Sequence, residues 1–211
     1  MKALLNDIAD IQIGYQNRGE SPLVNRDSKG SHKMIQVKDL DSDGKNVAEV
    51  FVKGGTIPCV WSSDLLEITP SGKPERYLVT KGHVLFLYRG RRLSAAAITE
   101  SLKDTIAAYH FYILKPDASK VLPEYLAWFI NHPKPNAFLT SFLRGSHIPM
   151  LPKNDFLKLE VIIPPIKTQR SIVELERLRQ KEEFILSKLV DARKRLINGL
   201  GFQAATSTGQ K

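Results

Sequence analysis

Three arginines gather at a predicted turn between two strand-like segments. Arg89, Arg91 and Arg92 surround Gly90, and the next acidic residue is Glu100. Arginine side chains on a rigid turn can donate two hydrogen bonds to a guanine edge in the major groove, or they can hold phosphates. The chemistry that these residues predict is therefore recognition of DNA. The alternative interpretation is a solvated hairpin tip.

Two further segments offer the same chemistry. Residues 144–147 read Arg-Gly-Ser-His, which places a cation and two hydrogen-bonding side chains on one loop. The alternative there is a helix C-terminus capped by Gly145, where an arginine is favourable. The other segment is the polar loop that follows Gly14 and runs from Tyr15 to Lys33. The candidate DNA-binding residues are Tyr15, Arg18, Lys33, Arg89, Arg91, Arg92, Arg144, Ser146 and His147.

Catalytic motifs are absent from the sequence. It has no G-x-x-x-x-G-K-[ST] phosphate loop, no G-x-S-x-G nucleophile elbow and no H-E-x-x-H pair. Residues 41–46 have the composition of a turn, but the acidic pattern of a calcium loop is missing. His110 lies in a strand-like segment, where a structural role is favoured, and the single cysteine, Cys59, excludes an internal disulfide. We therefore predict a protein that is not an enzyme, without catalytic residues, metal ion or cofactor of its own.

The composition is that of an ordinary soluble protein with a basic bias. The chain has 211 residues, 42% of them hydrophobic, and a net charge of +9. A basic balance is compatible with nucleic acid or with an acidic partner, although alone it is weak support. No apolar run approaches the roughly 18 residues of a membrane span, and acidic residues come too early for a signal peptide. A cytoplasmic location follows as the default.

A long helix is predicted over residues 166–198. It follows the Pro164-Pro165 pair and contains no proline or glycine before Gly199, which is the usual punctuation of helix ends. Its length would be about 45 Å. Apolar residues recur at alternating spacings of three and four residues, interrupted only by Glu182, and this pattern is typical of a coiled coil. This helix seam consists of Leu175, Leu178, Glu182, Ile185, Leu189, Ala192 and Leu196. We expect the seam to pack on another helix; the alternative is a helix folded back over its own domain.

Strand-like segments dominate the first half of the chain and helix-like segments the second. The predicted strands are residues 34–37, 47–52, 84–89, 94–98, 106–114 and 159–163, and the predicted helices before the long one are residues 123–131 and 136–143. This order predicts an α+β domain with a twisted, mainly antiparallel sheet and a small helical part. We place a DNA-binding domain at 1–163, the long helix at 164–200 and a disordered tail at 201–211.

Landmarks along nearly the whole chain resemble the specificity (S) subunits of type I restriction-modification systems. They are residues 5–11 with Gly14, 35–40, 82–86, 111–117, 123–126, and Gly145 with Ile148. The most specific is residues 159–173, LEVIIPPIKTQRSIV, which is similar to the family's strand-Pro-Pro-Leu-x-x-Gln-x-x-Ile-Val signature. Two features depart from the family pattern. His83 stands where an aspartate is usual, and typical members carry two target-recognition domains and two long helices where this chain has one of each.

The resemblance implies a function and partners. In the family the two long helices form an antiparallel coiled coil that holds two recognition domains at a fixed distance. A half-length chain can rebuild this arrangement as a homodimer that pairs through the helix seam. Its two recognition domains would then lie about one DNA turn apart on a bipartite, palindromic target. The partners implied are double-stranded DNA, a methyltransferase subunit and a restriction subunit, with S-adenosylmethionine bound only by the methyltransferase partner. The alternatives are a detached recognition domain of a fused methyltransferase-nuclease and a coiled-coil module that does not bind DNA.

Overall fold

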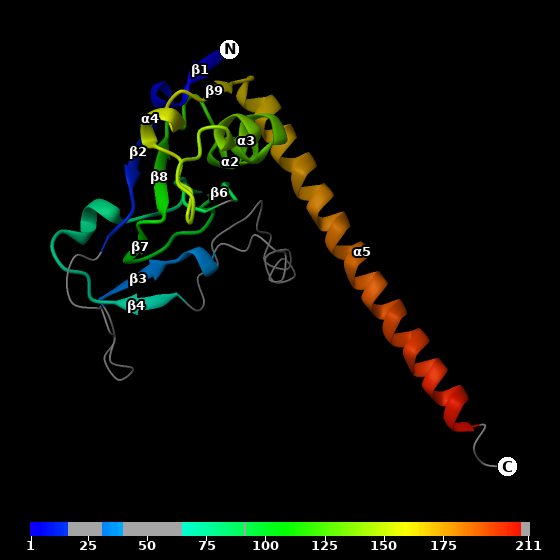
Figure 1. Cartoon of the computed structure of the whole chain (residues 1–211). Helices are drawn as coiled ribbons and strands as arrows, with labels where there is room; N and C mark the ends of the chain where they lie inside the picture. The colour runs from blue at the N-terminus through cyan, green and yellow to red at the C-terminus, as the bar shows by residue number, and fades with distance from the viewer. Residues whose placement is uncertain (17–30, 40–64, 91, 208–211) are drawn as a thin grey trace.

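A long C-terminal helix projects from a domain built around two small sheets (Figure 1). The computed structural model describes residues 1–16, 31–39, 65–90 and 92–207. The predicted strand at 47–52 lies outside these residues, as do Arg18 and Arg91. Within the described part, no helix is long and apolar enough to span a membrane.

The larger sheet has four antiparallel strands and forms the centre of the domain. Its order is β2 (Ala9–Ile13), β8 (Phe111–Pro116), β5 (Val84–Leu87) and β6 (Ser94–Ala97). Helix α2 (Pro123–Asn131) packs on β6, where three successive alanines allow a close approach. The Asn131 side chain donates to the Ala95 carbonyl and accepts from the Ala95 N–H, both at 2.8 Å. The predicted helix at 123–131 is confirmed, and the predicted strands at 84–89 and 94–98 are observed as β5 and β6, which end two residues and one residue earlier.

The smaller sheet has three strands, in the order β4 (Leu66–Ile68), β3 (His32–Ile35) and β7 (Thr105–Ala107). The prediction of one strand over residues 106–114 is wrong, because this run divides into β7 and β8, which belong to different sheets. A turn closed by the Phe111 N–H and the Ala108 carbonyl at 3.1 Å separates the two strands. The chain thereby crosses between the sheets, and β3 pairs with β7 in the parallel direction.

The two ends of the domain meet in a third, two-stranded sheet. It pairs β1 (Lys2–Leu4) with β9 (Glu160–Ile162) in the antiparallel direction. The remaining elements are α3 (Pro133–Thr140), α4 (Lys153–Phe156) and the 3-10 turns Leu5–Asp7, Val37–Asp39 and Pro74–Tyr77. The helix predicted at 136–143 thus begins and ends about three residues earlier. Residues brought together from both ends of the domain form the main core, for example Leu5, Ile8, Phe86, Tyr125, Phe156 and Val161.

Helix α5 (Ile166–Ser207) is longer than predicted. It has 42 residues, which corresponds to about 63 Å at 1.5 Å per residue. It continues through Gly199 and Gly201, so the predicted helix end at residue 200 is wrong, and residues 201–207 are helical where a disordered tail was predicted. A glycine inside a helix costs only about 1 kcal/mol, which neighbouring turns can offset. Residues 208–211 lie outside the described part.

A buried glutamine fixes the start of α5 to the domain. Gln169 is fully buried, and its side-chain oxygen accepts from the Leu122 N–H at 2.8 Å. Its amide nitrogen donates to the carbonyls of Lys120 and Pro164 at 3.0 and 2.9 Å. A buried amide satisfied in this way specifies one packing arrangement. Gln169 therefore sets the direction in which α5 leaves the domain.

Candidate nucleic-acid interface

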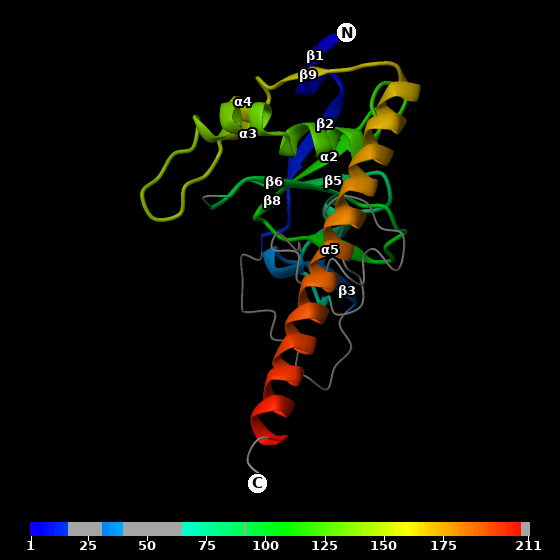
Figure 2. The ribbon, with the colours of Figure 1, turned by 90° about the vertical axis from the view of Figure 1, so that its right-hand side faces the viewer.

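Two of the predicted DNA-binding segments lie side by side, although more than fifty residues separate them in the sequence. Two backbone hydrogen bonds join them, from the Gly90 N–H to the Pro149 carbonyl at 2.7 Å and from the Leu151 N–H to the Tyr88 carbonyl at 2.9 Å. Arg89 and Met150 are thereby paired as in an antiparallel sheet. We call residues 88–90 and 144–150 the paired loops. Figure 2 shows residues 144–150 projecting from the domain on the side away from the start of α5.

The second of the paired loops is closed by its own pair of hydrogen bonds. The Arg144 N–H donates to the Met150 carbonyl at 3.0 Å, and the Met150 N–H donates to the Arg144 carbonyl at 2.8 Å. Gly145 turns the chain with a φ of +108°, a value that favours glycine. The side chains of Ser146 and His147 are exposed on this loop. Because α3 ends at Thr140, Gly145 is not the cap of that helix, and the alternative interpretation of this segment is wrong.

Arg89 is held in place rather than free in solvent. Its guanidinium carbon lies 5.2 Å from the centre of the Tyr109 ring, within range for a cation–π contact. Its Nε is buried and has no hydrogen-bond partner in the described part of the chain. The same holds for Nδ1 of His110, whose ring lies 4.0 Å from that of Tyr109. Burial, and then the charge of Arg89, lowers the pKa of His110.

Arg144, which begins the second of the paired loops, forms an ion-pair triad with Asp155 and Lys158. Its Nη2 lies 3.0 Å from Oδ2 of Asp155, and Nζ of Lys158 lies 2.8 Å from the other carboxylate oxygen. The Asp155 side chain is 6% exposed, whereas those of Arg144 and Lys158 are 71% and 62% exposed. The carboxylate therefore anchors two cations that remain accessible, and the triad keeps a net positive charge.

The Asp155 carboxylate gives a pH test of this triad. The hydrogen bond from Lys158, together with the charges of Lys158 and Arg144, holds its pKa below the usual value. The unfolded chain has an ordinary carboxyl pKa of about 3.9, so this contribution to stability is present above about pH 5 and is lost as the pH falls towards the lower folded value. We expect the melting temperature of Asp155→Asn, followed by circular dichroism, to fall less between pH 5 and pH 3 than that of the wild type. Parallel curves would contradict the role given to Asp155.

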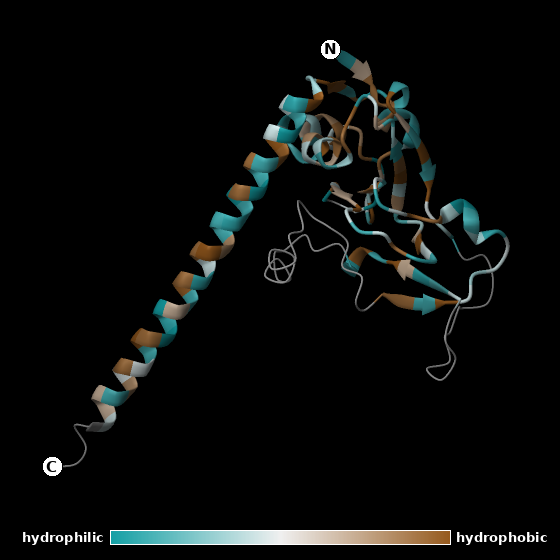
Figure 3. Cartoon of the chain, turned by 180° about the vertical axis from the view of Figure 1, so that it is seen from behind, coloured by the Kyte–Doolittle hydropathy of each residue, from teal (hydrophilic) through white to brown (hydrophobic). Residues whose placement is uncertain are grey.

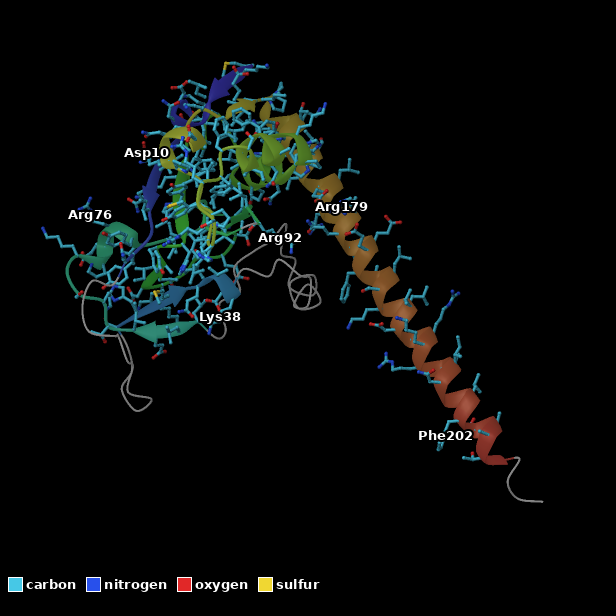
Figure 4. All side chains as sticks on the ribbon, in the orientation of Figure 1. Asp10, Lys38, Arg76, Arg92, Arg179 and Phe202 are labelled. Atoms are coloured by element: carbon cyan, nitrogen blue, oxygen red, sulfur yellow. The ribbon has the colours of Figure 1, made fainter. Side chains whose placement is uncertain are left out.

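None of the other predicted DNA-binding residues belongs to the paired loops. Tyr15 is 5% exposed, and its hydroxyl accepts from the Ser71 N–H at 2.9 Å. We therefore leave Tyr15 out of the proposed DNA-binding surface. Lys33 is exposed on β3, in the smaller sheet, and Arg92 is exposed next to β6 (Figure 4). Arg18 and Arg91 lie outside the described residues.

Sequence reasoning missed the residues that position the arginines. These are Tyr109, Met150, Asp155 and Lys158. The i, i+3 spacing of Asp155 and Lys158 is a weak local signal of an ion pair. The contacts of Arg89 with Tyr109 and Met150 join residues distant in sequence, and no local pattern indicates them.

The helix seam forms a second exposed surface. Its five large apolar side chains are between 48% and 69% exposed, and Figure 3 shows apolar residues along α5 where the helix has left the domain. At about 100° per residue, the seam lies roughly opposite the side that carries Gln169, Ile172 and Val173, which face the domain. Phe202 lies near the far end of α5, well away from the domain (Figure 4). The alternative of a helix folded back over its own domain is therefore wrong.

A comparison with protein-family models matches residues 5–184 to the type I restriction modification DNA specificity domain. The chain belongs to this family. The match spans the domain from residue 5 onwards, including both paired loops, and the first part of α5. A search of curated proteins finds no significant match.

Solved structures of type I restriction-modification proteins share the fold. One, described as the structural basis underlying complex assembly and conformational transition of the type I R-M system, has a TM-score of 0.64 at 16% identity and covers 95% of this chain. The HsdS subunit from Thermoanaerobacter tengcongensis has a TM-score of 0.60 at 19% identity and covers 92%. The type I S subunit from M. genitalium has a TM-score of 0.51 at 12% identity and covers 93%. This chain spans only 43%, 46% and 43% of those chains, respectively.

Membership of the type I restriction modification DNA specificity family confirms the resemblance seen in the sequence, and the α+β fold with a long C-terminal helix is confirmed as well. DNA-target specificity is the function that this family supports. In the described part of the chain, no three His, Cys, Asp or Glu side chains are grouped so that they could hold a metal ion.

Proposed function

We propose that the paired loops bind double-stranded DNA in a sequence-specific manner. The observation that carries this proposal is the joining of two cationic loops from distant parts of the chain by backbone hydrogen bonds, with Arg89 and Arg144 anchored and Ser146 and His147 exposed beside them. Anchored arginines beside exposed hydrogen-bonding side chains are suited to base edges and phosphates. A merely solvated hairpin tip would not need this anchoring.

In this proposal the chain is the specificity subunit of a type I restriction-modification system. It brings a methyltransferase subunit, and with it a restriction subunit, to the target site. S-adenosylmethionine and the catalytic groups belong to those partners. Family membership supports this role, and the net charge of +9 favours association with DNA.

We further propose that α5 pairs with α5 of a second copy in the antiparallel direction. Its seam is exposed on the side away from its own domain, and an apolar stripe of this length gains stability only when another surface covers it. The chain also spans less than half of each of the three solved chains from type I restriction-modification systems that it resembles. A second copy related by two-fold symmetry would supply an identical seam.

The apolar seam defines one symmetric register for this pair, and the charges on α5 are compatible with it. The midpoint of the seam between Leu175 and Leu196 falls between Ile185 and Leu186, which makes these two residues neighbours across the two-fold axis. In that register Glu183 lies level with Lys188 of the other copy, and Glu182 lies level with the other Leu189. Glu183 already accepts from Arg179 at 2.5 Å, so a small network of opposite charges would lie on each side of the two-fold axis, near the middle of the pair. The apolar seam would supply most of the association, because exposed ion pairs contribute little.

Such a pair would read two half-sites on one duplex. With 42 residues in α5, nearly complete overlap would place the two helix–domain junctions up to roughly 60 Å apart. This spacer is longer than the 45 Å expected from the sequence. Two-fold symmetry predicts an inverted repeat interrupted by bases that are not read.

Selection from random duplexes by mobility shift tests the proposed function. We expect the wild-type chain to enrich an interrupted palindrome, and we expect binding to weaken steeply with salt, because several phosphates are neutralised. The control is a parallel selection in which the Leu189→Asp variant replaces the wild type. A single half-site enriched by both proteins would contradict the paired arrangement. If the wild type enriches nothing, DNA recognition by this chain is wrong and a scaffold role is favoured.

A further inference from the structure

We infer that Arg89 reads a guanine base, whereas Arg144 contacts the DNA backbone. This inference rests on the proposed function and assigns different tasks to two arginines that the sequence does not distinguish. It follows from how each guanidinium is held.

The backbone of Arg89 is fixed on both sides. The hydrogen bonds of Gly90 with Pro149 and of Tyr88 with Leu151 lie immediately next to it. The hydroxyl of Tyr112 also donates to the Leu151 carbonyl at 2.9 Å, and this bond is buried. The Cα position of Arg89 therefore depends on the sheet itself and not on a mobile loop tip.

The Arg89 guanidinium can offer its hydrogen-bond donors to DNA in only one way. The Tyr109 ring covers one face of the guanidinium region, and Nε is buried. A bidentate contact through Nε and one terminal nitrogen is therefore blocked, and any bidentate contact of Arg89 must use its two terminal nitrogens. A pair of parallel donors matches the O6 and N7 acceptors that guanine presents in the major groove.

Arg144 has the opposite properties. Its side chain is 71% exposed, and one terminal nitrogen already donates to Asp155. Lys158 shares the same carboxylate and is also exposed. Two accessible cations on one anchor can accommodate phosphates in several positions, which suits a contact that fixes orientation without reading sequence. Arg89 thus combines a fixed backbone position with two terminal donors, whereas one terminal nitrogen of Arg144 already donates to Asp155.

The test repeats the duplex selection with Arg89→Lys and Arg144→Lys. Both variants keep the charge, but lysine cannot present two parallel donors. We expect Arg89→Lys to reduce the preference for guanine by about tenfold to a hundredfold at one position in each half-site and to leave the other positions unchanged. For Arg144→Lys we expect the same preferences as the wild type, with a similar change in affinity for all duplexes.

Tyr109→Leu provides a second variant, because it keeps Arg89 and removes the ring that orients it. The preference should weaken at the same guanine and by a smaller factor than in Arg89→Lys. Melting temperatures of all three variants establish that the domain is folded. If Arg89→Lys keeps every base preference, or changes a position that is not guanine, the inference is wrong while the proposed function stands. If the wild type enriches no sequence, both are wrong.

Discussion

Replacing Leu189 by aspartate should convert the proposed dimer into monomers. Leu189 is 48% exposed in the single chain, so a symmetric pair covers two half-exposed leucines. Their loss would cost on the order of 2 kcal/mol, and an unpaired carboxylate at each site adds a larger penalty. In the proposed register each new carboxylate also lies level with Glu182 of the other copy. We expect the dissociation constant, measured by sedimentation equilibrium, to rise at least about a hundredfold.

Two further variants at this surface test the side and the register of the pairing. Ser187 is exposed on the side of α5 opposite the seam, so Ser187→Asp should leave the dimer intact. Leu189→Lys removes the same apolar area as Leu189→Asp but places a cation near Glu182, and it should retain more dimer. Equal dimer populations for Leu189→Asp and the wild type would remove the seam from the interface. Equal loss for the aspartate and lysine variants would contradict the register.

The consequence for DNA binding follows from symmetry. A monomer presents one set of paired loops, so it gains no avidity from a second half-site. The Leu189→Asp monomer should therefore bind a half-site and a complete site with about the same affinity, whereas the wild type prefers the complete site. This comparison separates loss of pairing from loss of DNA recognition, because the paired loops lie on the domain and not on α5.

Elements with strong local signals could be predicted from the sequence. Helix α2 occupies residues 123–131 as predicted, because a proline at its first turn precedes an amphipathic run. The division between β7 and β8 could not be predicted, since the apolar run from 105 to 116 contains no glycine or proline before Pro116. A tertiary contact divides this run. The Ala108 N–H donates to the Ile35 carbonyl at 2.9 Å, and this hydrogen bond holds the chain in the smaller sheet.

The candidate site could likewise be predicted from local sequence signals but not where it depends on tertiary contacts. The composition of residues 89–92 and 144–147 was enough to propose both as cationic loops. Their pairing depends on hydrogen bonds between residues about sixty positions apart, and such contacts leave no local pattern. Likewise the glutamine of the signature that follows Pro164-Pro165 is visible in the sequence, but its contacts with Leu122 and Lys120 appear only in the fold. Motifs thus indicated candidate residues, and the structure shows which of them lie together.

Gly14 is a further landmark of the sequence whose role becomes clear in the structure. It follows β2, and its N–H donates to the Phe111 carbonyl at 2.9 Å. A Cβ at this position would lie 2.2 Å from the Ala108 carbonyl oxygen and 2.6 Å from that of Ala107. Both neighbours are backbone atoms of the crossing between the two sheets, so no side-chain rotation can relieve the clash. Glycine is required here for space.

Gly14→Ala should therefore destabilise the domain by about 3 kcal/mol or more, which corresponds to a fall of roughly 10 °C in melting temperature for a protein of this size. Gly72→Ala is the matched control, since Gly72 has a φ of +81° but nothing within 4 Å of the added Cβ. Its cost is the backbone strain alone, about 1 to 2 kcal/mol. Thermal unfolding followed by circular dichroism measures both. A smaller loss for Gly14→Ala than for Gly72→Ala would mean that the sheets can separate at this crossing, and the fixed placement of the paired loops on the larger sheet would then lack its support.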